Sequence, residues 1–517
     1  MDRFSHDTIL VLDFGAQYSQ LIARRVRERH VYSQIVPYTI SAEAVRKIAP
    51  KGIIFSGGPA SVGTSDSPRP DARLFQLGIP ILGICYGLQA IAVMNGGKVL
   101  RPDHREYGFA NLNINGNPSA LLKGVTNGSQ VWMSHGDSVV VPPANSICTA
   151  STVNCPFTVV ENPTGNWYGV QFHPEVVHTT EGSRILANFV LDMCHAKADW
   201  SMGSFIESQI EQIKAKVGDR QVLCGLSGGV DSSVAAALIH RAVGDQLVCV
   251  FVNNGLLRKG EADLVLQVFR DNFKIRLQYA DAQQEFLEAL KGVSEPEAKR
   301  KIIGKVFIDV FEREARKAGD ITFLAQGTLY PDVIESISPS GGPSATIKSH
   351  HNVGGLPKDF RFTLLEPLRE LFKDEVRQLG KELGLPDVIV YRHPFPGPGL
   401  GVRCIGEVTK TRLDTLREVD AIFIDEIRKA GLYDKIWQAL ACLLPVKSVG
   451  VQGDERTYEE VCSLRAVTSE DAMTADWFRF PPEVLQNAAA RICNDVAGVN
   501  RVLYDITSKP PGTIEWE

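Results

Sequence analysis

The sequence predicts an α/β protein with two doubly wound, mainly parallel-sheet domains followed by a smaller α+β C-terminal domain. Short apolar runs bounded by Gly or Pro alternate with helical stretches from residue 8 to about 195, as expected of a parallel sheet covered by helices. The alternation starts again after residue 204 and gives way, beyond residue 393, to long helices followed by strands. We therefore expect three domains, at residues 1–197, 198–392 and 393–517.

The first elements are a strand predicted at TILVLDFG and a helix predicted at SQLIARRVRERH. Further strands are predicted at GIIFSGGP and PILGICYG, because each is a short apolar run ended by Gly or Pro. This order of elements is typical of a doubly wound sheet.

The second segment opens with a helical stretch, FIESQIEQIKAKV, and its next elements repeat the strand and helix alternation through QLVCVFVNNG, KIRLQYA and ITFLAQGT. The Pro/Gly cluster HPFPGPGLG marks the start of the third segment. Strands are predicted there at VKSVGVQGD, SLRAVTSE and RVLYDITS.

The composition is that of a globular protein, with 44% hydrophobic and 22% charged residues among 517. Lys and Arg number 55 against 60 Asp and Glu, and no basic stretch offers a footprint for nucleic acid, so we expect no such partner. No secretory signal and no run of eighteen apolar residues is present, which predicts a cytoplasmic protein without a membrane span. The ten cysteines form no CxxC pair, so we expect reduced thiols rather than disulfides or a structural metal.

The segment GICYGLQ, residues 83–89, is the first candidate site. A predicted strand delivers Cys85 into a turn between two glycines, and a predicted helix begins directly after it. Small neighbours permit a strained turn, and a helix N-terminus favours the thiolate form of the cysteine. A buried structural cysteine beside packing glycines is the alternative interpretation.

The segment QFHPE, residues 171–175, supplies a partner for Cys85. His173 and Glu175 lie two residues apart at the end of a predicted strand, so they are expected to share one face. The carboxylate would then orient an imidazole that serves as the acid/base for Cys85.

Together, GICYGLQ and QFHPE resemble the class I glutamine amidotransferases. The resemblance implies that Cys85 attacks the glutamine amide, His173 passes a proton to the leaving ammonia, and Glu175 orients His173. FSGGP, at residues 55–59, resembles the oxyanion loop of that family, which implies stabilisation of the intermediate by the N–H groups of Gly57 and Tyr86. An ordinary turn at a strand end is the alternative for these glycines.

The segment LSGGVDSS is the second candidate site. A predicted strand ends in Ser-Gly-Gly and a helix follows at once, so backbone N–H groups and the helix dipole converge on one point. This arrangement is an anion cradle, and it has no lysine of the kind that reaches the γ-phosphate in a Walker A loop. Its residues are Ser227, Gly228, Gly229, Val230, Asp231, Ser232 and Ser233.

SGGVDSS resembles the signature of the N-type ATP pyrophosphatases. The resemblance implies that the loop holds the β- and γ-phosphates of ATP as a leaving group while a substrate attacks the α-phosphate. Asp231 would serve the Mg²⁺ that accompanies ATP, because a bare carboxylate beside pyrophosphate would repel it.

The whole chain resembles the GMP synthetase family, through HPFPGPGLG, VGVQGDER and the tail DITSKPPGTIEWE in addition to the two sites. This implies that ammonia from glutamine aminates XMP that ATP has activated as an adenylate. The resemblance assigns XMP contacts to Arg258, Asp454, Lys509 and Glu515. Each of these residues, taken alone, could equally be a solvated surface charge.

Two further features follow from the same resemblance. Lys373 matches a lysine on a mobile lid near the nucleotides, although its KDE neighbourhood also suits an exposed helix face. A homodimer is implied as well. An amidotransferase acting on another acceptor, or a non-catalytic metabolite sensor, remains the alternative function.

Overall fold

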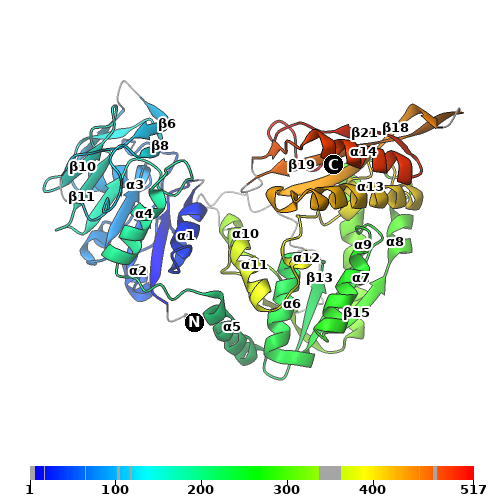
Figure 1. Ribbon diagram of the computed structural model, residues 1–517. Helices are drawn as coiled ribbons and strands as arrows, with labels where there is room; N and C mark the ends of the chain where they lie inside the picture. The colour runs from blue at the N-terminus through cyan, green and yellow to red at the C-terminus, as the bar shows by residue number, and fades with distance from the viewer. Residues whose placement is uncertain are drawn as a thin grey trace. The chain divides into compact units, whose positions relative to one another are not determined.

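The computed structural model describes residues 6–16, 18–64, 66–101, 105–116, 119–336, 362–452, 455–469 and 474–517. The chain forms two compact units, one built mainly from residues up to Phe205 and one mainly from Ile206 onward. Figure 1 shows a sheet with helices in the first unit and two sheets with helices in the second.

The first unit is built on an eight-stranded sheet with the order β2-β1-β3-β4-β12-β11-β10-β7. Five neighbouring strands are parallel: β2 (Tyr32–Pro37), β1 (Thr8–Asp13), β3 (Gly52–Phe55), β4 (Ile81–Ile84) and β12 (Trp167–Val170). The antiparallel strands are β11 (Val159–Asn162), β10 (Ile147–Ser151) and β7 (Asn113–Ile114). The last residues of β4 and β12 are paired, Ile84 with Val170, so the two segments that follow them start side by side.

Helices cover both faces of this sheet. Helices α2 (Ala42–Ile48) and α3 (Tyr86–Met94) belong to one core with inward side chains of β1, β3 and β4, whereas α1 (Ser19–Arg27) packs with α4 (Gly182–Ala187). Two small antiparallel ribbons flank the sheet, β5 (Lys98–Leu100) with β9 (Ser138–Val141) and β6 (Glu106–Asn111) with β8 (Gln130–His135).

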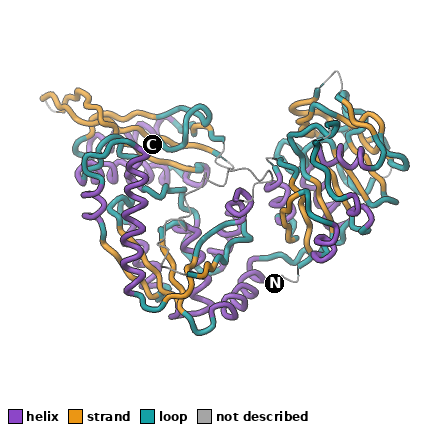
Figure 2. The backbone as a smooth tube through the Cα atoms, turned by 180° about the vertical axis from the view of Figure 1, so that it is seen from behind, coloured by secondary structure: helices purple, strands orange, loops and turns teal. Residues whose placement is uncertain are grey.

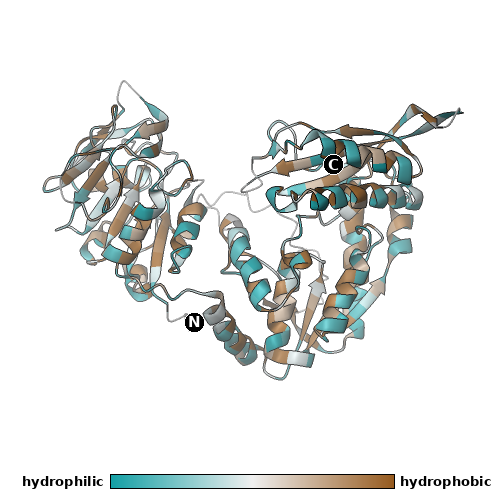
Figure 3. Cartoon of the chain, in the orientation of Figure 1, coloured by the Kyte–Doolittle hydropathy of each residue, from teal (hydrophilic) through white to brown (hydrophobic). Residues whose placement is uncertain are grey.

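The second unit begins with α5 (Met202–Val217) and a five-stranded parallel sheet with the order β15-β14-β13-β16-β17. Its strands are β13 (Gln221–Leu226), β14 (Leu247–Asn253), β15 (Arg276–Asp281), β16 (Ile321–Ala325) and β17 (Thr363–Leu365). Helix α6 (Val230–Val243) packs against α11 (Lys373–Glu382), and α9 (Pro296–Lys317) packs on β14 and β15. Figure 3 shows hydrophobic colour on the strands and hydrophilic colour on the outer sides of these helices.

The C-terminal part of the second unit is a small α+β layer. A long hairpin of β18 (Gln438–Gln452) and β19 (Glu455–Thr468) is joined by β20 (Asp476–Trp477) and β21 (Val499–Tyr504). Helices α13 (Lys410–Lys429) and α14 (Pro482–Asp495) pack together along this sheet, as Figure 2 also shows. One hydrophobic core continues from α9 through α13 to β18 and β19, which is why both layers belong to a single unit.

The predicted fold class is confirmed: two mainly parallel α/β sheets precede an α+β layer. The ten cysteines are free, and eight of them are buried. In the described part of the chain, no helix combines the length and apolarity needed to cross a bilayer.

The close approach of α3 to β3 makes a stability test possible. A Cβ atom on Gly87 would overlap the carbonyl oxygen of Phe55, so we expect Gly87→Ala to destabilise the first unit by about 1–3 kcal/mol. Gly304→Ala is the matched control, because Gly304 lies within α9 with no atom near its Cβ position, and alanine is favoured in a helix by roughly 0.5–1 kcal/mol. Calorimetric melting of both variants checks this, and an unchanged melting temperature for Gly87→Ala would contradict it.

Candidate active sites

Cys85 occupies a strained turn between β4 and α3. Its φ of 52° and ψ of −105° lie in a region that residues with a side chain rarely adopt. The turn needs glycine on both sides: a Cβ on Gly83 would lie 2.5 Å from the amide nitrogen of Leu88, and one on Gly87 would strike Phe55. The thiol is therefore held at the N-terminus of α3, as predicted from GICYGLQ.

His173 and Glu175 meet as predicted, but not on a strand. Strand β12 ends at Val170, and both residues lie in the turns that follow it, so the prediction that they share a strand face is wrong. The turn still brings Nδ1 of His173 to 2.7 Å from Oε1 of Glu175, with both residues at least 95% buried. The main-chain oxygen of Glu175 accepts from Nε of Arg25 at 2.9 Å, which anchors this turn to α1.

The charge of the histidine follows from its neighbours. Burial disfavours the imidazolium, but the negative charge of Glu175 and hydrogen bonds with Cys85 and Glu175 outweigh burial and raise the pKa of His173 to about 11. The ring of Tyr18 packs edge-on against the imidazole at 5.4 Å. The site can therefore present a proton donor beside a thiol at neutral pH.

The predicted oxyanion loop lies against this pair. A Cβ on Gly57 would be 3.2 Å from Cε1 of His173 and 3.9 Å from Cβ of Cys85. The Ser56 hydroxyl fixes the loop, accepting from the amide of Phe14 at 3.0 Å and donating to the Gly57 oxygen at 2.9 Å. The amide of Tyr86 belongs to the first residue of α3, directly after the thiol.

Two glutamines that the sequence analysis did not single out also reach this site. Nε2 of Gln171 lies 3.6 Å from Sγ of Cys85, and Nε2 of Gln89 lies 3.4 Å from Oε1 of Gln171. The Gln89 amide thus turns the Gln171 donor toward the sulfur. Gln89 belongs to the motif GICYGLQ and Gln171 to the motif QFHPE. Their places in these two motifs could therefore have identified them as site residues.

The second site lies where β13 ends and α6 begins. Gly228 has a φ of +75°, and the hydroxyls of Ser227 and Ser232 lie 3.0 Å apart across the turn. The Ser227 hydroxyl accepts from the amide of Gly229, and the Ser232 hydroxyl from the amide of Ser227. The loop therefore encloses the N-terminus of α6, as an anion cradle requires.

Lys373 is paired with Asp231 of this loop. Lys373 is the first residue of α11, and its Nζ lies 2.6 Å from each carboxylate oxygen of Asp231. The Gly228 oxygen, on the other side of the loop, accepts from Nη1 of Arg392 at 2.8 Å. Two hydrogen-bond acceptors of the loop, the Asp231 carboxylate and the Gly228 oxygen, are thus each bound to a cationic side chain.

A single carboxylate in this loop suits a cation that is bound mainly through phosphate oxygens. Within the described ranges, no cluster of three or more His, Cys, Asp or Glu side chains could hold a metal by itself. Mg²⁺ is commonly held by one or two carboxylates together with substrate phosphates. Asp231 therefore fits the Mg²⁺ prediction.

Two residues predicted to contact XMP belong to one buried charge network. Arg258 lies 3.1 Å from Asp420, and Arg403, which is fully buried, lies 3.9 Å from Asp420 and 2.8 Å from Glu515. Gln438 donates to Glu515 at 2.6 Å. The sequence predicted the outer members of this network but neither Asp420 nor Arg403, which belong to no motif.

Of the other two predicted XMP contacts, only Lys509 lies among the described residues. The backbone of Lys509 pairs with Ala475, at 2.8 and 3.0 Å. Asp454 lies outside the described residues. Another histidine of the first unit, His135, is a core residue: it contacts the main-chain oxygen of Asp137 at 3.1 Å and Glu106 at 3.5 Å.

Three family models match the chain: glutamine amidotransferase class-I at residues 10–193, NAD synthase at residues 202–298, and GMP synthase C terminal domain at residues 425–516. A protein of Bradyrhizobium sp. (strain ORS 278) named GMP synthase (glutamine-hydrolyzing) is 58% identical over 516 residues, which is 99% of this chain and 96% of that protein. Proteins with the same name are 56% identical in Rhizobium johnstonii, over 100% of both chains, and 58% identical in Clostridium botulinum, over 99% of both.

A solved structure from Thermoplasma acidophilum, described as that of a putative GMP synthase subunit, is also similar. It is 27% identical, with a TM-score of 0.33, and covers 37% of this chain and 96% of its own.

The His173–Glu175 pair predicts a pH-dependent contribution to stability. Because the folded pKa of His173, about 11, exceeds its unfolded value of about 6.5, the pair stabilises the fold fully below about pH 6.5 and progressively less toward pH 11. We expect Glu175→Gln to lower the melting temperature more at pH 6.5 than at pH 9.5. Glu28→Gln, which removes an exposed partner of Arg25, is the control. An equal loss at both pH values for Glu175→Gln would contradict the assignment.

Proposed function

The chain belongs to the family of glutamine-hydrolysing GMP synthases, and we propose how its residues divide the reaction. Glutamine-dependent GMP synthesis needs a source of ammonia and a means of activating XMP. We assign the first to the thiol site and the second to the loop at β13. The observation that carries the assignment is the pairing of a strained Cys85 with the buried His173–Glu175 pair.

In the first unit, Cys85 attacks the side-chain amide of glutamine, and the N–H groups of Gly57 and Tyr86 stabilise the oxyanion that forms. His173 gives its proton to the nitrogen as the C–N bond breaks, which releases ammonia and leaves a thioester on Cys85. Water then hydrolyses the thioester to glutamate, with His173 accepting its proton. Glu175 holds the imidazole in the orientation that both steps need.

In the second unit, the loop from Ser227 to Ser233 holds the β- and γ-phosphates of ATP at the N-terminus of α6, through backbone N–H groups and hydroxyls. The 2-oxygen of XMP attacks the α-phosphate, and pyrophosphate leaves. Ammonia then attacks the purine carbon that bears the adenylylated oxygen, and AMP leaves with that oxygen to give GMP. The full-length relatives favour XMP over another acceptor, since they carry the GMP synthase name at 56–58% identity.

Asp231 would hold Mg²⁺ together with the phosphates, and the ion would supply charge neutralisation for the leaving pyrophosphate. Lys373, which neutralises the same carboxylate in this structure, would then be free to contact the phosphates itself. We propose that the role of Lys373 is to exchange its contact with Asp231 for a contact with the phosphates.

We propose that XMP binds in the C-terminal part of the second unit, against Arg258, Asp454, Lys509 and Glu515. The charge network through Asp420 and Arg403 supports this, because it gives the outer residues fixed positions. A carboxylate and an amide side by side, such as Glu515 and Gln438, suit hydrogen bonds to a purine or ribose.

We also propose that the chain acts as a homodimer in the cytoplasm. Exposed apolar side chains lie together on one face of the β18–β19 hairpin, where Val449 is paired with Tyr458 and Val451 lies two residues further along β18. An exposed apolar stripe on neighbouring strands is typical of a surface that meets a second copy. The ten free thiols favour a reducing compartment.

Replacement of the thiol tests the division of labour. We expect Cys85→Ala to abolish GMP formation from glutamine and to leave formation from ammonium salt within about twofold of the wild type, because the thiol acts only in releasing ammonia. Cys148→Ala, which changes another thiol of the first unit, should retain both activities. Rates are measured with MgATP and XMP by separating GMP, AMP and pyrophosphate. Equal loss with both nitrogen donors in Cys85→Ala would overturn the proposal.

Replacement of the loop carboxylate tests the second site. We expect Asp231→Asn to lower the glutamine- and ammonia-driven rates together by roughly ten- to hundredfold, since a charge-assisted contact is worth about 1.5–3 kcal/mol. Raising the Mg²⁺ concentration should recover part of the rate. Asp263→Asn, an exposed carboxylate at the start of helix α7 (Glu261–Val265), is the control. A fall confined to the glutamine-driven rate would be inconsistent with the assignment of Asp231.

A further inference from the structure

The sulfur of Cys85 has hydrogen-bond partners of both kinds. As a thiol it donates to the main-chain oxygen of Ser134, on β8, at 3.7 Å. Nε2 of Gln171 donates to the same sulfur at 3.6 Å, and His173 is hydrogen-bonded to it as well. A thiol needs one acceptor for its proton, whereas a thiolate is stabilised by each donor that points at it. Two donors against one acceptor therefore favour the anionic form of the sulfur.

The sheet holds Gln171 beside the sulfur. The amide of Cys85 donates to the oxygen of Val170 at 2.8 Å, and the amide of Gln171 donates to the oxygen of Thr158 at 2.8 Å. These two bonds continue the pairing of β12 with β4 on one side and with β11 on the other. The separation of the Cys85 and Gln171 side chains is therefore set by strand register, whereas His173 lies in the turn beyond.

Gln89 determines which end of the Gln171 amide faces the sulfur. Gln89 lies one turn after Cys85 in α3, and its Nε2 donates to the Asp137 oxygen at 2.7 Å and to Oε1 of Gln171 at 3.4 Å. Because Oε1 accepts from Gln89, the donor end of the Gln171 amide points at Cys85. A reversed amide would set an oxygen against the sulfur and a donor against the donor of Gln89, so both contacts would become repulsive.

Burial makes this donor effective. Gln171 is fully buried and Gln89 is 4% exposed, so water does not compete for these contacts. A buried amide costs free energy unless its polar atoms are paired, and both polar atoms of the Gln171 side chain have partners. An apolar side chain of the same shape would fill this space without that cost. The buried amide therefore calls for a chemical reason, and the sulfur in front of it supplies one.

Resting on the proposed function, we infer that Gln171 is a further catalytic residue of the thiol site, donating a hydrogen bond to the Cys85 thiolate, and that Gln89 positions it. The donor acts twice. It first stabilises the thiolate that attacks the glutamine amide. When water later hydrolyses the thioester, the hydroxyl of water joins the acyl carbon, its proton goes to His173, and the C–S bond breaks with its electron pair left on sulfur. The thiolate that faces Gln171 is thereby restored.

Alkylation of Cys85 by iodoacetamide, without glutamine or nucleotides, reports the thiolate directly. The peptide that contains Cys85 is followed by mass spectrometry, because the other cysteines are also free. We expect Gln171→Met, which keeps the length of the side chain and removes its donor, to slow alkylation at pH 7 by about 10-fold or more. The pH of half-maximal alkylation should rise by about one unit or more.

The titratable groups around the thiol and its histidine are the same in every variant. They come from the turn after β12, from the residue before α1, and from the end of β8 with the turn that follows it: His173, Glu175, Tyr18, His135 and Asp137. A shift of the alkylation profile in Gln171→Met therefore measures the loss of the amide donor.

Glutamine hydrolysis separates this role from packing. We expect Gln171→Met to lower kcat for glutamine hydrolysis by about 10-fold or more, with the KM for glutamine and the rate of GMP formation from ammonium salt within about twofold of the wild type. Gln89→Met is the second variant, should Gln171→Met fail to fold. It should slow alkylation by about 2- to 10-fold, because Gln171 keeps its donor but loses the group that orients it.

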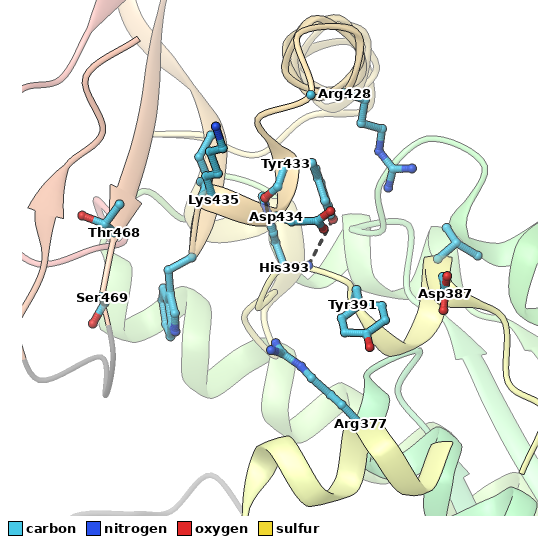
Figure 4. A pocket seen from close by; sticks show the side chains of 14 residues that line it. Arg377, Asp387, Tyr391, His393, Arg428, Tyr433, Asp434, Lys435, Thr468 and Ser469 are labelled. Carbon is cyan, nitrogen blue, oxygen red and sulfur yellow. Dashed lines mark hydrogen bonds between the residues drawn. The ribbon is translucent and has the colours of Figure 1, made fainter. Parts of the chain in front are cut away.

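Two control variants change residues outside the thiol site. Gln34→Met makes the same exchange on β2, the edge strand of the same sheet. Lys435→Gln changes the second unit, in the wall of a cavity of about 810 Å³ that Arg377, from α11, and Arg428, from α13, also line (Figure 4). Neither control should change the alkylation rate of Cys85 by more than about twofold.

The remaining outcomes separate the possible failures. An unchanged alkylation profile in folded Gln171→Met would overturn the inference. A fall in kcat with that profile unchanged would overturn it too, because the amide would then act elsewhere than on the sulfur. If the wild type formed no glutamate from glutamine, the proposed function would fail instead.

Discussion

Two buried cations determine where the end of the chain lies. Lys299 on α9 and Arg403 after the Pro/Gly cluster have fully buried side chains. Each is neutralised from the last three residues, Lys299 by Glu517 at 2.5 Å and Arg403 by Glu515 at 2.8 Å. Removing one partner of a buried pair costs about 3–5 kcal/mol, because a charge stays buried without compensation. The C-terminal tail is therefore part of the core of the second unit, and its position fixes one end of the charge network formed by Glu515, Arg403 and Asp420.

Both candidate sites lie at the carboxyl ends of parallel strands. Cys85 follows β4, and the turn with His173 follows β12, whose last residue pairs with the last residue of β4. Ser227 follows β13 in the same way. Residues that follow a parallel strand no longer make hydrogen bonds within the sheet. A helix that begins there points its N-terminus at the same edge of the sheet. One architectural rule thus places the Cys85 thiol in the first unit and the Ser-Gly-Gly loop in the second.

The cationic side chains of the second unit differ in how far carboxylates neutralise them. Arg403 is held by carboxylates, and burial is outweighed by Glu515 and Asp420, which raise the pKa of Arg403. Lys373 is paired with a carboxylate that also suits a metal, so its contact is exchangeable. Arg377 and Arg428 have no carboxylate partner among the described residues and face a cavity. Cations that stabilise the fold, such as Arg403, thus differ from cations whose charge no carboxylate of the described residues neutralises.

Local patterns in the sequence were enough to predict the fold class, the thiol turn and the phosphate loop: apolar runs, glycines beside Cys85, and SGGVDSS before a helix. They also predicted His173 and Glu175 as partners but placed them on a strand, since a turn after Val170 leaves no periodic signal. Which distant charges meet was visible only in the folded chain. Asp420, Arg403 and Glu515 are joined across about a hundred residues, and Arg377 and Arg428 come from different helices. Electrostatic pairing depends on distance in space, which strand register and helix packing set and which no local spacing encodes.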